Sequence, residues 1–153
     1  MIGHLQSNKV KYIIDKVDLI HSLDRMSLAK EIEKRARKLN KTVNCLIQVN
    51  IADEKSKFGL KKDKVLDFID KLKNFEHIKI KGLMTIAPYD ENPENVRYVF
   101  KEMKCMFEEI KTLDYKNLEM EYLSMGMTND FEIAIEEGSN MIRVGTGLFG
   151  KRD

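Results

Sequence analysis

Residues 42–52, TVNCLIQVNIA, form the clearest strand pattern in the sequence. Most of these residues are apolar or β-branched, which is typical of a β-strand. Amphipathic helical patterns flank this run, one after Asp24 and the other over 63–75. The centre of the chain therefore predicts a strand between two helices, as in a layered α/β domain.

The same alternation continues outward in both directions. Short apolar runs predict strands at 1–5, 18–23, 42–52, 78–87, 119–124 and 141–144, and helical patterns predict helices capped by Ser7 and by Asp24 and helices over 63–75, 93–113 and 130–137. Strands joined through helices run parallel with right-handed crossovers. A doubly wound sheet and a (β/α) barrel both fit this order, but a full barrel takes eight strands and typically ~250 residues. The 153 residues therefore predict a smaller open sheet or a barrel that lacks two units.

The bulk composition indicates an ordinary globular chain. The 27 basic and 25 acidic residues nearly balance at a net charge of +2, so neither nucleic acid nor a membrane surface is expected as a partner. His4, His21 and His77 lack metal-ligand spacing, so no metal site is expected, and His21 is interpreted as a hydrogen-bonded core or rim residue. No secretory segment opens the chain and no apolar run could span a bilayer, so the cytoplasm is the expected location.

Ligands of parallel α/β proteins bind at the C-terminal ends of the strands, and two such ends are informative here. The segment SMGMT, residues 124–128, passes from a strand through Gly126 towards a helix start. Thr128 and Asn129 are both helix-capping residue types, and a helix start offers unpaired N–H groups to a phosphate. Taken alone, the pattern favours a simple cap, and a phosphate site remains the alternative.

The second informative end is RVGTG, residues 143–147. Gly145 and Gly147 let a ligand approach the backbone closely, their neighbouring N–H groups can form an anion nest, and Thr146 adds a hydroxyl. Arg143 must point either to solvent or into a polar site, because a buried unpaired guanidinium is costly. A turn of this kind usually binds no ligand, but two such segments on adjacent strands would converge on one anion site.

Six long motifs carry a resemblance to a known family. They are IGHLQSNKVKYI (2–13), HSLD (21–24), IQVNIADEKSKFG (47–59), GLMTIAP (82–88), LSMGMTND (123–130) and IRVGTGLFGKRD (142–153). In this order they resemble the pyridoxal phosphate homeostasis protein family over the whole chain. The resemblance implies the fold-type III barrel of the alanine racemase N-terminal domain and pyridoxal 5'-phosphate (PLP) as cofactor. It also implies a carrier or regulator of vitamin B6 and amino-acid balance, without catalytic turnover.

The resemblance assigns roles to residues of the two strand ends. Thr128 would contact the phosphate, Gly145 and Thr146 would offer it N–H groups and a hydroxyl, and Arg143 would face the pyridine nitrogen. An arginine there keeps that nitrogen unprotonated, which makes the cofactor a poorer electron sink. The expected cofactor-binding set is Met125, Gly126, Met127, Thr128, Arg143, Gly145 and Thr146, and no catalytic residue is expected.

The sequence departs from the family pattern at its beginning. In the family, a lysine that forms a Schiff base with PLP ends the first strand, well upstream of the motif at 2–13. The resemblance thus implies one partial barrel domain, 1–153, lacking the first two βα units and that lysine, and its open edges predict self-association. Two other hypotheses stay open: a fragment of a fold-type III racemase or decarboxylase, and an unrelated α/β module for a sugar phosphate or nucleotide.

Overall fold

The structure, a computed structural model, describes residues 1–54 and 56–150. Residue 55 of the expected polar loop and residues 151–153 of the last motif lie outside the described residues. The main sheet contains, in spatial order, β1 (Leu19–Leu23), β2 (Val43–Asn50), β4 (Ile78–Thr85) and β5 (Leu118–Ser124), and the short β3 (Leu60–Lys61) pairs with β2. Every one of these pairings is parallel, as predicted.

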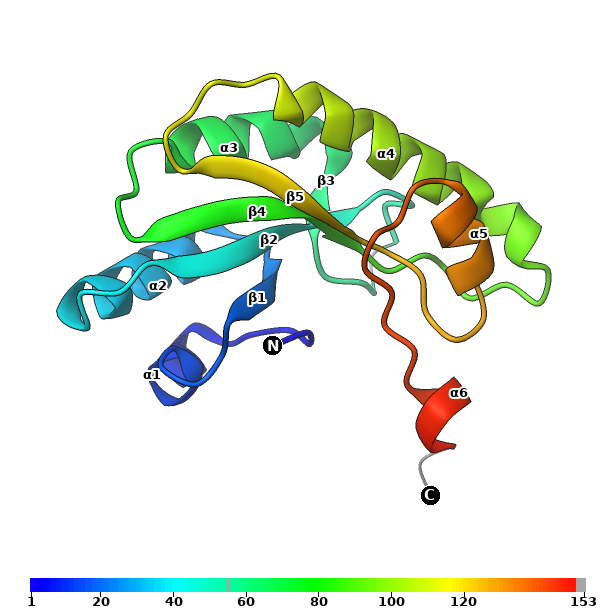
Figure 1. Cartoon of the computed structure of the whole chain (residues 1–153), viewed down its shortest axis with the longest axis horizontal. Coiled ribbons are helices and arrows are strands. Elements are labelled where there is room, and N and C mark those ends of the chain that lie inside the picture. Colours follow the sequence, from blue (N-terminus) through cyan, green and yellow to red (C-terminus); the bar gives the residue numbers. More distant parts are fainter. Residues whose placement is uncertain (55, 151–153) are drawn as a thin grey trace.

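The strand order identifies the architecture. The main strands follow the chain order from β1 to β5, and the same order continues at both edges. At one edge the Met1 amine donates to Leu19 O (2.8 Å) and His21 N–H donates to Met1 O (2.9 Å); at the other, Ser124 and Met141 form a parallel bridge. A doubly wound sheet reverses its strand order at a switch point, whereas a barrel wall does not. The predicted parallel barrel-type fold is therefore confirmed, seen in the described residues as an open sheet (Figure 1).

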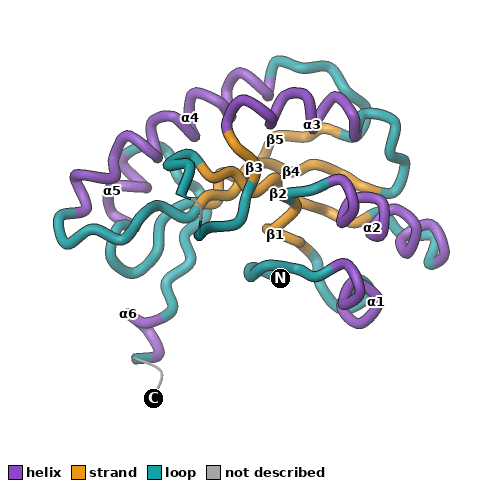
Figure 2. Tube along the Cα trace, turned by 180° about the vertical axis from the view of Figure 1, so that it is seen from behind, coloured by secondary structure: helices purple, strands orange, loops and turns teal. Residues whose placement is uncertain are grey.

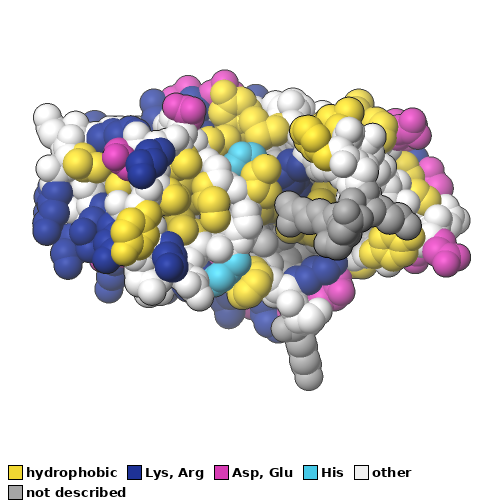
Figure 3. All heavy atoms as spheres, turned by 90° about the horizontal axis from the view of Figure 1, so that it is seen from below, with side chains coloured by type: hydrophobic (Ala, Val, Ile, Leu, Met, Phe, Trp, Pro, Cys, Tyr) yellow, Lys and Arg dark blue, Asp and Glu magenta, His cyan; other side chains and the backbone are white. Residues whose placement is uncertain are grey.

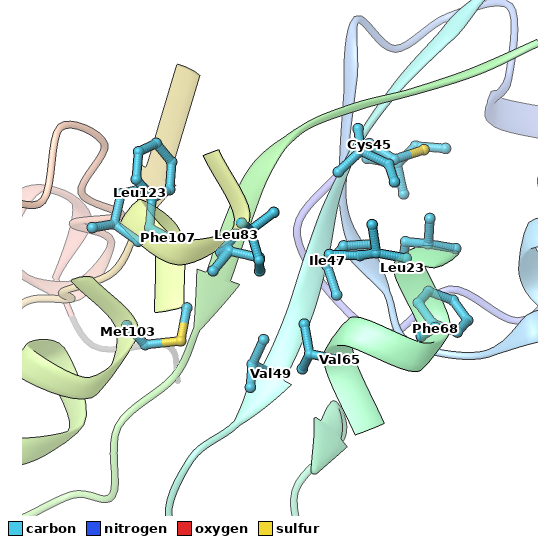
Figure 4. Packing of buried hydrophobic residues seen from close by; sticks show 14 of the residues in the cluster. Leu23, Cys45, Ile47, Val49, Val65, Phe68, Leu83, Met103, Phe107 and Leu123 are labelled. Atoms are coloured by element: carbon cyan, nitrogen blue, oxygen red, sulfur yellow. The ribbon is translucent and has the colours of Figure 1, made fainter. Parts of the chain in front are cut away.

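Three long helices accompany the sheet (Figures 1 and 2). They are α2 (Met26–Lys38), α3 (Val65–Leu72) and α4 (Arg97–Lys111), and the short helices are α1 (Val10–Ile13), α5 (Phe131–Glu136) and α6 (Thr146–Phe149). The buried sides of the long helices share one apolar cluster with alternate strand residues. Figure 4 shows Ile47 and Val49 of β2 lying beside Val65 of α3. Burial of these apolar side chains is the main stabilising contribution to the layer.

The opposite face of the sheet positions the candidate site. Side chains alternate between the two faces of a strand, so Leu46 and Gln48 of β2 face away from the helix cluster. Gln48 is in register with Met84, and Met84 with Ser124. Leu46 and Met84 are fully buried yet lie outside the helix cluster. This second face, here called the inner face, therefore carries polar residues such as Gln48 and Ser124 among buried apolar ones.

Two of the expected strands are wrong. Of residues 1–5, Met1 alone pairs with β1, and no strand is assigned there. Residues 141–144 give a single bridge at Met141, because Arg143 N–H donates to Gly126 O (3.0 Å), in the loop beyond β5, and so leaves the ladder. Both segments still lie along the sheet edges in the predicted order. The sequence pattern did not predict β3 or α6, which are only two and four residues long.

The expected caps are partly wrong. Ser7 lies inside a 3₁₀ turn, Ser7–Lys9, and makes no cap. The N-cap of α2 is Arg25, and the Asp24 carboxylate accepts from the Arg25 guanidinium (2.6 Å) instead of from the helix backbone. Pro93 does begin a helical segment, as predicted, and the Asn92 side chain caps it. Within the described residues, no helix is long and apolar enough to cross a membrane.

Candidate functional site

A buried polar cluster lies on the inner face at the C-terminal ends of the strands. It consists of the side chains of His21 from β1, Ser124 from β5 and Arg143 after the last bridge, together with the backbone carbonyl of Thr85 from β4. The Thr85 hydroxyl itself donates to Val49 O and is not part of the cluster. Each of the four is less than a tenth exposed. Viewed from below in Figure 3, this side of the molecule shows hydrophobic side chains with histidine among them. Polar groups buried to this degree are normally hydrogen-bonded, so their partners define what the cluster can bind.

Arg143 is the centre of the cluster. Its Nη1 donates to Ser124 Oγ and its Nη2 to the Thr85 carbonyl oxygen, both at 2.7 Å. Its Nε is buried and has no partner among the described residues. Burial lowers the pKa of Arg143 to about 10, and Asp130 opposes the shift, so the guanidinium stays charged at neutral pH. Of the two predicted orientations, solvent or polar site, the structure has the second.

His21 is the neutral member of the cluster. Its Nδ1 lies 3.3 Å from Ser124 Oγ. Burial, together with the positive charges of the amino terminus and of Arg143, lowers the pKa of His21 to about 4. The prediction of a hydrogen-bonded core residue is therefore confirmed. No group of three metal-ligating side chains occurs among the described residues.

The two segments singled out by sequence converge beside this cluster. Gly147 N–H donates to Thr128 Oγ1 (3.1 Å), and Arg143 N–H donates to Gly126 O (3.0 Å). Thr128 does not cap α5, because that helix has Asp130 as its N-cap residue, and the Asp130 carboxylate accepts from Met127 N–H (2.6 Å). The predicted convergence is thus correct, and the simple-cap interpretation of Thr128 is wrong.

Unsatisfied donors border open space in this region. The backbone N–H groups of Thr128, Gly145 and Thr146 have no acceptor among the described residues. A Cβ added to Gly145 would meet nothing within 4 Å, whereas one on Gly147 would lie 3.0 Å from Thr128 Cγ2. Gly147 therefore allows the two segments to pack, and Gly145 leaves room for a ligand. We call Thr128, Gly145 and Thr146 the cradle.

The other three expected site residues shape the loop. Met125 is fully buried, and the N–H of Met127 is already bonded to Asp130. Gly126 has φ +93°, and a Cβ there would lie 2.7 Å from that of Ala134. Glycine is required at this position by α5 and by the backbone conformation. These three residues hold the loop against α5, and none of their side chains offers a polar donor.

The loop after β2 forms the rim of the site. Lys57 Nζ donates to Ala87 O (2.9 Å), and Gln48 Nε2 donates to Phe58 O (3.2 Å). The Phe58 ring stacks on His4, with ring centroids 3.8 Å apart. These contacts connect Lys57 and Phe58 to the ends of β2 and β4 and to the first segment.

The roles of Thr85 and Ser124 are not predicted by the sequence motifs. Each is the last residue of its strand and is fully buried, and Thr85 takes part through its backbone carbonyl. A polar residue that ends a buried parallel strand is a usable signal, because that end faces the ligand side of the fold. The specific pairing with Arg143 carries no such signal, since it joins residues 58 and 19 positions apart.

A barrel-type wall with donors and a buried cation at its C-terminal end defines a class of cofactor-binding domain. Residues 1–153 match the family described as alanine racemase, N-terminal domain, and the chain belongs to this family. Curated relatives are named pyridoxal phosphate homeostasis proteins, as the sequence motifs suggested. That of Aquifex aeolicus is 48% identical over 151 residues, and that of Escherichia coli K12 is 35% identical over 153. The chain spans about two thirds of their length, 65% and 64%.

Solved structures give the same result. PipY of Synechococcus elongatus, with PLP bound, has a TM-score of 0.86 at 31% identity over 97% of this chain and 68% of its own. Alanine racemase of Clostridium difficile has a TM-score of 0.70 at 16% identity, over 98% of this chain and 40% of its own. The second likeness shows a shared fold alone.

Proposed function

We propose that this chain binds PLP without catalysing a reaction on it, as part of a protein that maintains vitamin B6 and amino-acid balance. One observation carries the proposal: a buried, charged Arg143 lies beside three N–H groups that have no acceptor in the described part of the chain and that border open space. PipY, a relative with PLP bound, and the names of the curated relatives support the choice of ligand.

The cradle fits the phosphate of such a ligand. Three N–H groups and the Thr146 hydroxyl supply four donors, and a phosphate offers strong acceptor oxygens. A side chain at Gly145 would fill the open space next to these donors. The Thr128 hydroxyl accepts from Gly147 N–H and can still donate its own proton to the ligand.

Arg143 fits the ring of the ligand. A guanidinium is always a donor, so a ring nitrogen that faces it must be an acceptor and therefore unprotonated. PLP stabilises negative charge in reactions through a protonated ring nitrogen, and an unprotonated one makes it a poorer electron sink. Arg143 in this position favours holding the cofactor over using it. Racemase assays on several amino acids are expected to show no turnover, and turnover would favour the enzyme hypothesis.

We also propose that residues 1–153 form one partial barrel domain that self-associates through its open sheet edges. The edges at Met1 and at Met141 each pair with the sheet on one side. Exposed strand edges recruit further backbone partners. Light scattering is expected to give a mass above that of one chain, and a monomer with a sharp unfolding transition would contradict this.

One experiment tests the binding proposal. The protein is dialysed against PLP, the bound amount is measured, and the complex is reduced with borohydride and mapped by mass spectrometry. We expect one saturable site that is competed by inorganic phosphate, with no stoichiometric lysine adduct. An adduct on one lysine would contradict the expectation that the Schiff-base lysine is missing from 1–153. A chain that retained no PLP would contradict the binding itself.

A further inference from the structure

We propose that Ser124 and His21 are positioning residues: Ser124 fixes the Arg143 guanidinium, and a neutral His21 fixes Ser124, so that Arg143 is the single cation of the cluster. This inference rests on the proposed function for its purpose, since Arg143 is the group that would face the cofactor ring. The hydrogen bonds that it invokes are contacts within this chain and do not depend on a bound cofactor. Neither residue belongs to the cradle or to the predicted cofactor-binding set.

The direction of the first hydrogen bond follows from what the groups can donate. Arginine has no acceptor, so Arg143 Nη1 donates and Ser124 Oγ accepts at 2.7 Å. The hydroxyl proton of Ser124 then points away from Arg143, and in the proposed arrangement it is donated to His21 Nδ1, 3.3 Å away. To accept, Nδ1 must carry no proton, so His21 is the neutral ring with its proton on Nε2. The chain of donation runs from Arg143 through Ser124 to His21.

Protonation of His21 would break this chain. A charged ring would donate from Nδ1 to Ser124, whose own proton would then have no acceptor in the pair. It would also place a second positive charge next to Arg143 in a buried space, where like charges repel strongly. The lowered pKa of His21, caused by burial and by Arg143, agrees with exclusion of that state.

Ser124 is suited to fix the guanidinium because Arg143 has few other anchors. Thr85 O holds Nη2, and Nε has no partner among the described residues. Without the Ser124 hydroxyl, a single hydrogen bond to Thr85 would remain, and the planar group could turn about it. Two anchors on different strands, β4 and β5, fix the plane of the guanidinium together with its attachment to the side chain, whereas one anchor leaves it free to turn.

Ser22 provides a matched control. It lies next to His21 on β1 and, like Ser124, is fully buried, but its hydroxyl has no partner among the described residues. Ser22→Ala removes the same atoms as Ser124→Ala from the same kind of environment. A general effect of losing a buried hydroxyl would appear in both variants, and a positioning effect would appear in Ser124→Ala alone.

The first test uses no cofactor. In protein labelled with ¹⁵N-histidine, the side-chain nitrogens of His21 are expected to show the Nε2–H tautomer at neutral pH. Ser124→Ala is expected to shift His21 towards a mixture of tautomers, and Ser22→Ala to leave it unchanged. A charged ring or an Nδ1–H tautomer in the wild type would overturn the inference, and so would equal tautomer populations in all three proteins.

The second test measures PLP affinity by equilibrium dialysis. Losing a hydrogen bond to a charged group corresponds to roughly tenfold weaker binding, expected for Ser124→Ala and absent in Ser22→Ala. His21→Gln keeps an acceptor and is expected to bind PLP better than His21→Leu. Equal affinities for these two, or for the two serine variants, would overturn the positioning role. If the wild type bound no PLP, the proposed function would fail, while the histidine spectra would still decide the hydrogen-bond chain.

Discussion

In the part of the chain that the structure describes, charged side chains are exposed and paired at one end of the inner face, and buried without a counter-charge at the other. Near the starts of β4 and β5, Lys79 and Lys81 pair with Glu119 and Glu121, and both carboxylates are about half exposed. Near the strand ends, Arg143 is buried and has no carboxylate within salt-bridge distance among the described residues. Exposed, balanced pairs contribute little to stability, whereas an unbalanced buried cation is costly. The contrast marks the C-terminal end as the one arranged for an electron-rich ligand.

Arg143→Met should produce the largest effect. Its loss would remove the proposed charge-assisted contact to the ligand, and we expect PLP affinity to fall roughly 10- to 100-fold in equilibrium dialysis. Thermal stability should stay equal or rise, because an apolar side chain replaces a buried unbalanced charge. A large fall in stability, with unchanged affinity, would mean that Arg143 is part of the core and not of the site.

The two ends of the inner face should affect the pH dependence of stability in different pH ranges. The pKa of His21 is lowered from 6.5 to about 4, so between these values the unfolded chain binds a proton that the native chain does not. Stability should therefore fall by ~2–3 kcal/mol as the pH drops through this window and level off below it. Urea unfolding of the wild type and His21→Gln checks this, since the variant should lose the dependence.

At the end with the exposed ion pairs, the carboxylate of Glu119 titrates at lower pH. Its two lysines lower the pKa of the exposed Glu119 from 4.5 to about 2, so any stabilisation from this carboxylate is present above 4.5 and lost as the pH falls towards 2. Solvent and salt screen this contribution. A fall in stability that began only below the ordinary Glu119 pKa, in the wild type as in His21→Gln, would contradict the assignment to His21.

The two glycines of the RVGTG segment should respond differently to alanine. Gly145→Ala adds a methyl group that meets no atom within 4 Å, so stability should hold while the methyl narrows the space for the ligand. We expect about tenfold weaker binding of both PLP and inorganic phosphate. Gly147→Ala places its methyl 3.0 Å from Thr128 and should lower the melting temperature. Unchanged phosphate binding in Gly145→Ala would remove this residue from the cradle.

The smallest effect belongs to the charged end. Lys81→Met removes the pairs with Glu119 and Glu121 and should lower stability by less than about 1 kcal/mol. High salt should abolish the difference from the wild type, and PLP affinity should not change. A change in PLP affinity would mean that the two ends of the inner face are energetically coupled.

Much of the fold was predictable from local pattern. The apolar runs at 18–23, 42–52 and 78–87 each contain a strand, and their even spacing with helices between them predicts the parallel order. The failures are at the edges, at 1–5 and 141–144, where a strand has one neighbour and side-chain or loop contacts decide the backbone. Arg143 N–H, bonded to Gly126 O, is the clearest case.

The candidate site was predictable in composition but not in geometry. Two polar, glycine-containing strand ends indicated an anion site, and Thr128 does meet Gly147. The anchoring of Arg143 depends on residues from three different segments, and the neutral state of His21 depends on their packing. Long-range contacts of this kind leave no periodic pattern, so a single sequence cannot specify them.

Calorimetric titration of PLP into the wild type and into Arg143→Met tests the central claim most directly. The wild type should bind one PLP per chain, and Arg143→Met should bind it at least roughly tenfold more weakly while remaining as stable to heat. Equal binding by the two proteins, or no binding by the wild type, would contradict the assignment of the C-terminal end of the inner face as the cofactor site.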